Sequence, residues 1–257
     1  MPLDFAHAAI VFGAAFVAGM INSVAGGGTL LTFPVLIFVG LSSVTANATN
    51  TAAIWPGSLG GMWGYRRELQ TVHRRMLALV IPSLIGGVAG ALLLRWTPPT
   101  IFDKLVPFLI LFATLLFMAQ EPVQRKLKTA DVARHKTTGW LLGAMVFQLF
   151  VGLYGGYFGA GIGILMLAAL SILGLTDIHQ MNGLKNFFSM SINGVAALYF
   201  IWAKMVIWSD VIIMSVGAVI GGYLCAGLVR RMGSTTVRRI VIGIGFAMAV
   251  SLFVKKW

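Results

Sequence analysis

Ten apolar runs follow one another along this chain of 257 residues, with only short polar segments between them. A helix of about 20 apolar residues crosses a bilayer core about 30 Å thick, and most of the runs approach that length. The composition agrees, because 58% of the residues are hydrophobic and only 10% are charged. We therefore expect an all-α integral membrane protein with about 8–10 membrane segments. The runs are Phe5 to Ile21, Leu30 to Leu41, Val44 to Tyr65, Met76 to Leu94, Leu105 to Ala119, Trp140 to Phe158, Ile162 to Leu175, Asn186 to Trp202, Val211 to Val229 and Val237 to Val254.

The net charge of +12 does not indicate a nucleic-acid partner. The basic residues form short clusters between apolar runs and are not interleaved with aromatic residues on a polar face. The lipid bilayer is the expected partner, and assembly into a homo-oligomer is left open. The single cysteine, Cys225, excludes an internal disulfide and a CxxC metal site, so neither a metal nor a cofactor is expected. No Lys or Arg precedes the first apolar run, which indicates a membrane segment rather than a cleaved signal peptide.

Two of the runs are short, and each follows a glycine-rich break. Leu30 to Leu41 has 12 residues and Ile162 to Leu175 has 14, which as helices reach only about 18–21 Å. The breaks before them, Asn22 to Thr29 and Gly155 to Gly163, follow segments that match at a distance of 134 residues. This match predicts two homologous helical repeats, each with one short helix after a break and three longer membrane helices.

We interpret residues 1–122 and 138–257 as these repeats, joined by a basic cytoplasmic linker at 123–137. The arginines between positions 66 and 75 mark a second cytoplasmic loop. Whether each broken segment crosses the membrane once or folds back as a hairpin stays open, because the Lys and Arg counts do not decide it. We favour hairpins, which give the repeats inverted topology, because paired short segments interrupted by glycine are typical of inverted-repeat transporters.

The breaks free backbone N–H and C=O groups, which in a membrane must face protein or a water-filled cavity. A short helix that begins there points its first N–H groups and its positive dipole end at the cavity, which suits an anion. The alternative is that the glycines only allow close helix packing, but two long breaks at matching positions favour a site. The candidate residues in the breaks are Asn22, Ser23, Gly26, Gly27, Gly28 and Thr29 in the first half, and Tyr157, Gly161 and Gly163 in the second.

A polar segment follows each short run. Amides and hydroxyls in membrane helices usually face the interior of the bundle, so we expect these side chains to line the same cavity as the breaks. The candidates are Asn47, Thr49 and Asn50 in the first half, and Asn182, Lys185, Asn186 and Asn193 in the second.

Lys185 carries the one charge within these polar segments. A lysine near a helix end can instead extend to the membrane surface, but Asn182 and Asn186 flank it at helical spacing. All seven acidic residues lie at the ends of runs or in loops, so a sodium site or a carboxylate proton relay is not expected. An unpaired ammonium among amides predicts an anionic substrate.

These residues resemble the TauE/SafE family of membrane permeases, also called the sulfite exporter family. The resemblance rests on the first glycine-rich break, on the segment Gly40 to Thr49 and on its counterpart Met181 to Asn186, and it extends from Phe12 to about Val254. It implies a duplicated helical bundle that exports small sulfur-containing anions such as sulfite or organosulfonates. The second half has Ala168 where the first has Pro34, so the two halves need not have equal roles.

We therefore predict a multi-pass secondary transporter of the bacterial plasma (inner) membrane that exports sulfite or an organosulfonate by alternating access between the repeats. A passive anion channel would use the same residues, and another small organic anion would satisfy the same donors. An enzyme is not expected, because the apolar runs contain no catalytic cluster of His, acidic residues and Cys. The direction of transport, import or export, and the coupling ion are left open.

Overall fold

The computed structural model describes residues 4–24, 27–64, 66–70, 74–127, 138–172, 175, 178–232 and 234–256. Every regular element within these ranges is a helix, and no strand occurs among them, as the apolar runs predict. The helices are α1 (Phe5–Val24), α2 (Thr29–Phe38), α3 (Ser43–Gly64), α4 (Arg66–Gln70), α5 (Arg74–Leu77), α6 (Val80–Trp96), α7 (Pro99–Leu127), α8 (Thr138–Tyr157), α9 (Ile162–Ile172), α10 (Ile178–Trp202), α11 (Trp208–Met232) and α12 (Ser234–Lys256).

The two short apolar runs form the short helices α2 and α9, with 10 and 11 residues. Helix α2 ends where Gly40 adopts a φ of +100°, which favours glycine. The N–H of Leu41 then donates to the carbonyl of Leu36, a bond that closes helix ends of this type. Leu175 donates to the carbonyl of Leu170 in the same way after α9.

Two helices extend further than the apolar runs alone predict. Helix α7 continues to Leu127 and so includes the first residues of the expected linker, whose remaining residues, 128–137, lie outside the described part. Helix α10 begins at Ile178, eight residues before the apolar run that starts at Asn186. The added segments are rich in Gln, Lys, Leu and Met, which are good helix formers although several of them are polar.

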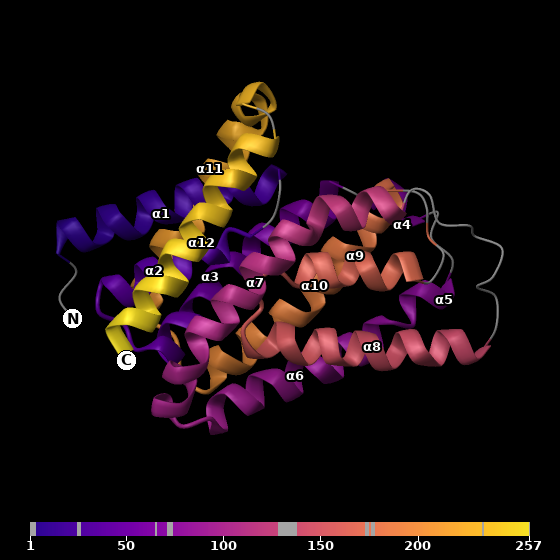
Figure 1. The fold of residues 1–257 in the computed structure, drawn as a ribbon, viewed down its shortest axis with the longest axis horizontal. Coiled ribbons are helices and arrows are strands. Elements are labelled where there is room, and N and C mark those ends of the chain that lie inside the picture. The colour runs from indigo at the N-terminus through magenta and orange to yellow at the C-terminus, as the bar shows by residue number, and fades with distance from the viewer. Residues whose placement is uncertain are drawn as a thin grey trace.

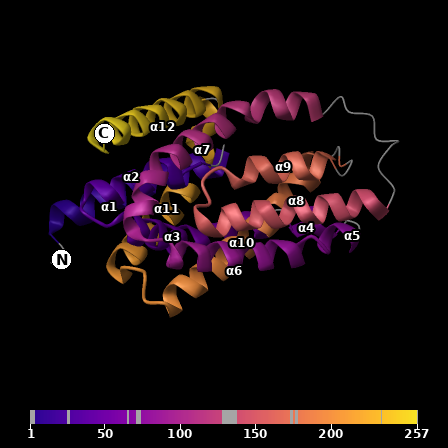
Figure 2. The ribbon, with the colours of Figure 1, turned by 60° about the horizontal axis from the view of Figure 1, so that its bottom comes forward.

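Helices of the first and second halves of the chain pack in reciprocal pairs. Helix α1 packs against α11, and α8, which has the same place in the second half, packs against α6. The central pair is α3 with α10, and α7 pairs with α12. Figure 1 shows both chain termini at one end of the long axis, and α4, α5 and the start of α8 at the other. Figure 2 shows α6 and α8 side by side from a second direction.

Glycines bring the reciprocal pairs into backbone contact. A Cβ atom at Gly156 of α8 would overlap the carbonyl oxygen of Gly87 in α6, and a Cβ at Gly90 would overlap that of Leu153. In the other pair, a Cβ at Gly221 of α11 would overlap the carbonyl oxygen of Phe16 in α1. Such close approach through small residues is typical of helix packing in membranes, where apolar burial alone does not hold helices together.

The short helices are buried, whereas the outer helices are apolar on both sides. Leu30, Phe33 and Leu36 of α2 are each 1% exposed. On α7 the inward residues are apolar, and so are the outward ones at helical spacing, which are 39–55% exposed. A helix that is apolar all round is typical of a membrane span. The outward residues of α7 are Ile101, Leu105, Phe108, Phe112 and Leu115.

Two helical segments in the described part are long and apolar enough to cross a bilayer: Phe5–Asn22 and Pro99–Ala119. Shorter apolar stretches lie in α2, α6, α8, α11 and α12. This pattern is consistent with a helical membrane protein. The expected number of spans and the repeat relation of the halves stay predictions.

Candidate functional site

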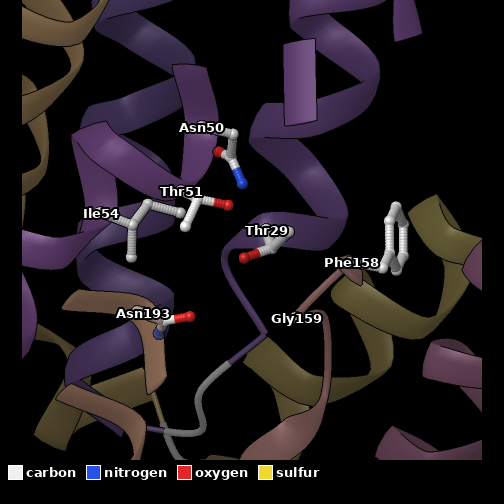
Figure 3. A pocket seen from close by; sticks show the side chains of 7 residues that line it. All are labelled: Thr29, Asn50, Thr51, Ile54, Phe158, Gly159 and Asn193. Atoms are coloured by element: carbon white, nitrogen blue, oxygen red, sulfur yellow. The ribbon is translucent and has the colours of Figure 1, made fainter. Parts of the chain in front are cut away.

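A small cavity lies where the ends of the two glycine-rich breaks meet α3 and α10 (Figure 3). Its volume is about 20 Å³, which is room for about one water molecule. The lining comes from both halves of the chain and carries amide and hydroxyl groups but no charged side chain. The lining residues are Thr29, Asn50, Thr51, Ile54, Phe158, Gly159 and Asn193.

The first break presents Thr29 to this cavity. Gly27 adopts a φ of +89°, and a Cβ there would also press on the ring of Phe117, so only glycine fits this turn. The N–H of Gly28 donates to Oδ1 of Asn22 at 2.8 Å. Asn22 therefore satisfies one of the N–H groups at the start of α2. The hydroxyl of Thr29, the first residue of α2, points into the space between Thr51 and Asn193 (Figure 3).

The second break places Phe158 and Gly159 at the cavity. Gly159 has a φ of +79°, again a conformation that favours glycine. The hydroxyl of Tyr154 donates to the carbonyl of Ala160 at 2.7 Å, which fixes the turn between α8 and α9. Phe158 packs edge-on against Phe33 of α2, with ring centroids 5.2 Å apart. The aromatic pair holds the two breaks against each other.

Asn50 lies on the side of the cavity formed by α3. It is 2% exposed, and its Oδ1 accepts a hydrogen bond from Oγ1 of Thr32 at 2.5 Å. Oγ1 of Thr32 also lies 3.1 Å from the carbonyl oxygen of Gly28. Because the oxygen of Asn50 is occupied by α2, its amide nitrogen is the group that points to the cavity (Figure 3).

Asn193 lies across the cavity, on α10. Its side-chain oxygen points to the cavity (Figure 3), and the amide makes no hydrogen bond with another described residue. Thr51 donates its hydroxyl to the carbonyl of Asn47 in its own helix at 2.9 Å. An amide can rotate to offer N–H or C=O groups, so Asn193 is the polar group of the lining that is most available to a ligand.

Asn47 and Tyr157 lie outside the cavity lining. Asn47 is fully buried, and its Nδ2 donates to the carbonyl of Tyr157 at 2.8 Å, which ties α3 to the end of α8. Its Oδ1 is buried without a hydrogen-bond partner among the described residues, at a cost of about 1–3 kcal/mol. The hydroxyl of Tyr157 lies 3.4 Å from Oγ1 of Thr97, and the Tyr157 ring packs edge-on against Phe102.

Thr49 also lies outside the lining. Its Oγ1 accepts a hydrogen bond at 3.1 Å from the N–H of Ile207, just before α11. Thr49 therefore joins α3 to α11, while the next residue, Asn50, faces the cavity.

Asn182, Lys185 and Asn186 lie on α10 at 7 to 11 residues before Asn193, so Lys185 is about 12 Å from Asn193 along the helix. The methylene chain of Lys185 packs on α9, since a Cβ at Gly163 would lie 3.2 Å from its Cδ. The ammonium of Lys185 has no ion pair or hydrogen bond within the part of the chain that the structure describes. Lys185 is therefore about two helical turns away from Asn193 and is not part of the cavity lining.

Four other predicted residues lie in the breaks themselves. Gly26 and the side chain of Ser23 lie outside the described residues. Gly161 has a φ of +78°. The N–H groups of Gly161 and Gly163 meet no acceptor among the described residues, so both remain donors at the start of α9.

The cavity also contains residues that the sequence reasoning did not select. Gly159 lies in the second break and Thr51 in the first polar segment, and both of these segments were predicted to line the cavity. Membership of these segments is the sequence signal that could have identified the two residues. The structure further pairs His7 of α1 with Asp210 of α11, with Nε2 2.8 Å from Oδ1. Asp210 is near the end of its apolar run, as expected, but it is 1% exposed. No cluster of metal ligands occurs among the described residues.

The sequence comparisons agree with one another. A family model described as "Sulfite exporter TauE/SafE" matches residues 11–252. The "Probable membrane transporter protein" of Haemophilus influenzae is 29% identical over 245 residues, which cover 95% of this chain and 93% of that protein. The "Probable membrane transporter protein ORF9" of a Sinorhizobium species is 25% identical over 250 residues, covering 97% and 94%. The "Probable membrane transporter protein YfcA" of Escherichia coli K12 is 27% identical over 244 residues, covering 95% and 88%.

No solved structure matches the chain. The family match includes both breaks, both polar segments and all the residues that line the cavity. The three relatives are each named a probable membrane transporter protein, and the chain matches 88–94% of their lengths. The chain is thus a membrane transporter, and it belongs to the sulfite exporter TauE/SafE family.

Proposed function

We propose that the protein is a multi-pass secondary transporter of the bacterial inner membrane that exports a small sulfur-containing anion, sulfite or an organosulfonate, by alternating access. The cavity between the two halves of the chain is the binding site. The observation that carries this proposal is the origin of the lining, because each half supplies residues from its break and from its polar segment. The family description, sulfite exporter, supports the class of substrate.

The chemistry of the lining suits a sulfonate or sulfite group, which presents oxygen acceptors. The amide of Asn193, the amide nitrogen of Asn50 and the hydroxyl of Thr29 point to one space (Figure 3). A hydrogen bond to a charged group contributes about 1.5–3 kcal/mol. Thr29 is also the first residue of α2, where the helix dipole favours negative charge.

The small volume of the cavity supports alternating access over a continuous pore. About 20 Å³ holds about one water molecule, so an oxyanion enters only after side chains or helices move apart. The size of the cavity therefore supports a carrier whose site opens and closes during transport. A passive anion channel, the alternative function, needs an open path through the same residues.

The two halves are proposed to be inverted repeats. This arrangement is supported by the reciprocal helix pairs. It is also supported by the opposite directions of α1 and α8, because α1 starts at the end with the chain termini and α8 starts at the opposite end (Figures 1 and 2). The arginine-rich helices α4 and α5 lie at the latter end, which the excess of positive charge assigns to the cytoplasm.

We assign Lys185 to the path along which the anion approaches the site from the cytoplasm. It lies on α10 between the start of that helix, Ile178, and Asn193. Its ammonium has no ion pair among the described residues, and in this position it attracts anions toward the cavity without contacting them in the closed state. The substitution Lys185→Ala should therefore slow substrate loading, whereas undiminished binding and loading would remove Lys185 from the function.

The test is binding of sulfite, sulfate, thiosulfate, sulfoacetate and taurine to the purified protein. Asn193→Ala should weaken binding of the preferred anion by about tenfold or more, from the loss of a hydrogen bond to a charged group. Ser191→Ala is the matched control, because Ser191 lies on the same helix and donates to the carbonyl of Phe187 instead of facing the cavity. Equal affinities for the two variants would contradict the assigned site.

Transport assays in proteoliposomes separate the two functions. A carrier gives a flux that saturates with substrate and supports exchange of labelled for unlabelled anion. A flux that rises without saturation and shows no exchange would favour the channel.

A further inference from the structure

The polar groups that face the cavity are a mixture of donors and acceptors. The amide nitrogen of Asn50 and the hydroxyl of Thr29 point to the space as donors (Figure 3). Oγ1 of Thr51 also points to it, but its hydrogen is donated to the carbonyl of Asn47, so toward the cavity this oxygen can only accept. The side-chain oxygen of Asn193 is a second acceptor. An oxyanion without any proton offers acceptors alone and therefore satisfies only part of this lining.

None of the seven lining residues carries a charge. Among the elements that supply the lining, α2, α3 and residues 158–161 contain no Asp, Glu, Lys, Arg or His. Helix α10 contains His179 and Lys185. These two residues lie 14 and 8 positions before Asn193, or about 21 and 12 Å along the helix. An anion in the cavity therefore contacts neutral groups only.

Two charges of opposite sign lie at similar distances from the lining. Asp103 of α7 accepts a hydrogen bond from the hydroxyl of Ser43 at the start of α3. Ser43 is seven residues before Asn50, which is about 10 Å along the helix. Lys185 lies about 12 Å from Asn193 along α10. Because the signs are opposite and the distances similar, the potentials of the two charges largely cancel at the cavity.

A neutral site of this kind discriminates between anions by their charge. The cost of transferring an ion from water into a protein interior rises with the square of the charge, so a dianion costs about four times as much as a monoanion of the same size. The attraction to neutral donors rises only in proportion to the charge. A lining with few donors and no cation therefore compensates a monoanion much better than a dianion.

We propose that the cavity selects oxyanions with a single negative charge, a sulfonate or the singly protonated form of sulfite, and rejects sulfate and the sulfite dianion. This proposal rests on the proposed function and names the charge state of its substrate. The proton of singly protonated sulfite supplies a donor for Oγ1 of Thr51 or for the oxygen of Asn193. For a sulfonate, which has no such proton, the amide of Asn193 turns to donate its N–H.

The first experiment compares methanesulfonate with sulfate by isothermal titration calorimetry on the purified full-length protein at neutral pH. The two anions have the same tetrahedral sulfur and similar size, but methanesulfonate has one negative charge and sulfate has two. Methanesulfonate should bind about tenfold more tightly than sulfate, or better, because of the difference in desolvation.

The second experiment varies the charge of one ligand. Sulfite changes from monoanion to dianion near neutral pH, so its apparent affinity should fall between about pH 6 and pH 9 and approach a tenfold loss per pH unit once the dianion dominates. Methanesulfonate keeps its charge over the same range. Its affinity should change by less than about twofold, which controls for titration of groups on the protein.

Asn193→Lys adds a positive charge to the lining and should raise the affinity for sulfate relative to methanesulfonate by about tenfold. Asn182→Lys is the matched control, because it adds the same charge to the same helix about 16 Å from Asn193, beyond the Debye length of about 8 Å. The control should leave the ratio of the two affinities unchanged. If Asn193→Lys does not fold, the comparison of anions on the unmodified protein still decides the question.

Two results would overturn the proposal. Sulfate that binds as tightly as methanesulfonate would leave the transport function standing and remove the selection by charge. An affinity for sulfite that stays constant or rises with pH would assign the dianion as the bound species. Failure of methanesulfonate, sulfate and sulfite alike to bind at any pH would instead contradict the proposed function itself.

Discussion

Replacing Gly156 by alanine should destabilise the protein by about 1–3 kcal/mol, because the added methyl group has no room between α8 and α6. A Cβ at this position would lie 2.9 Å from both the carbonyl carbon and the Cα of Gly87, and nearer still to the carbonyl oxygen, where ordinary contact begins at 3.4 Å. The difference between these two distances means that the helices must part by at least 0.5 Å. A gap of 0.5–1 Å forfeits about a quarter to a half of each dispersion contact along the interface.

The assay is equilibrium unfolding in mixed detergent micelles, followed by circular dichroism. Gly143→Ala is the matched control, since Gly143 lies on the same helix and a Cβ there would meet nothing within 4 Å. The control should be neutral or should stabilise by up to about 1 kcal/mol, because alanine is the better helix former. Equal free energies of unfolding for the two variants would refute the argument that the glycines are required for close packing.

Three further substitutions test the described contacts. Gln148→Leu should cost about 0.5–1.5 kcal/mol in unfolding free energy, because Gln148 donates to the hydroxyl of Ser83 at 2.8 Å between buried faces of α8 and α6. A double-mutant cycle with Ser83→Ala should give an interaction energy of similar size for this hydrogen bond, and strictly additive effects would contradict it. Phe158→Ala should cost about 3–5 kcal/mol in the same measurement through loss of its packing on Phe33, and a cost below about 1 kcal/mol would contradict that packing. Thr49→Val should speed hydrogen exchange at the amide of residue 207, and an unchanged exchange rate would show that the N–H has another acceptor.

The helical architecture could be predicted from the sequence because most of the apolar runs are long and the two short ones directly follow the glycine-rich breaks. The short helices α2 and α9 follow from the same signal, since glycine-rich segments stop the preceding helix. Their burial at the centre of the molecule could also be expected from their length. The early start of α10 was missed, because a polar helical segment before an apolar run resembles a loop when hydropathy alone is considered.

The site was predicted only at the level of segments. Thr29, Asn50 and Asn193 were selected because they lie in the breaks and polar segments, and the structure brings them to one cavity. Thr49 was selected by the same rule, but successive residues of a helix point about 100° apart, and Thr49 faces α11. Nothing in the local sequence distinguishes two neighbouring polar residues that pack against different helices.

The pairing of His7 with Asp210 could not be predicted from the local sequence either. The two residues are 203 positions apart and belong to different halves of the chain. Each alone resembles an ordinary polar residue near the end of an apolar run. Only the packing of α1 on α11 shows that the carboxylate is enclosed and that a histidine satisfies it.

The reciprocal helix pairs also set an order of events during synthesis. Helix α6 is already synthesised when α8 is made, so this pair can form at once. Helix α1 is made long before its partner α11, which begins 184 residues after α1 ends. At about 5–20 residues per second, this delay is roughly 10 to 40 seconds. During that time the small-residue face of α1 has no permanent neighbour in the membrane. Two contacts that are equivalent in the finished protein are therefore formed at different times, and the nascent chain is most open to misassembly at its first helix.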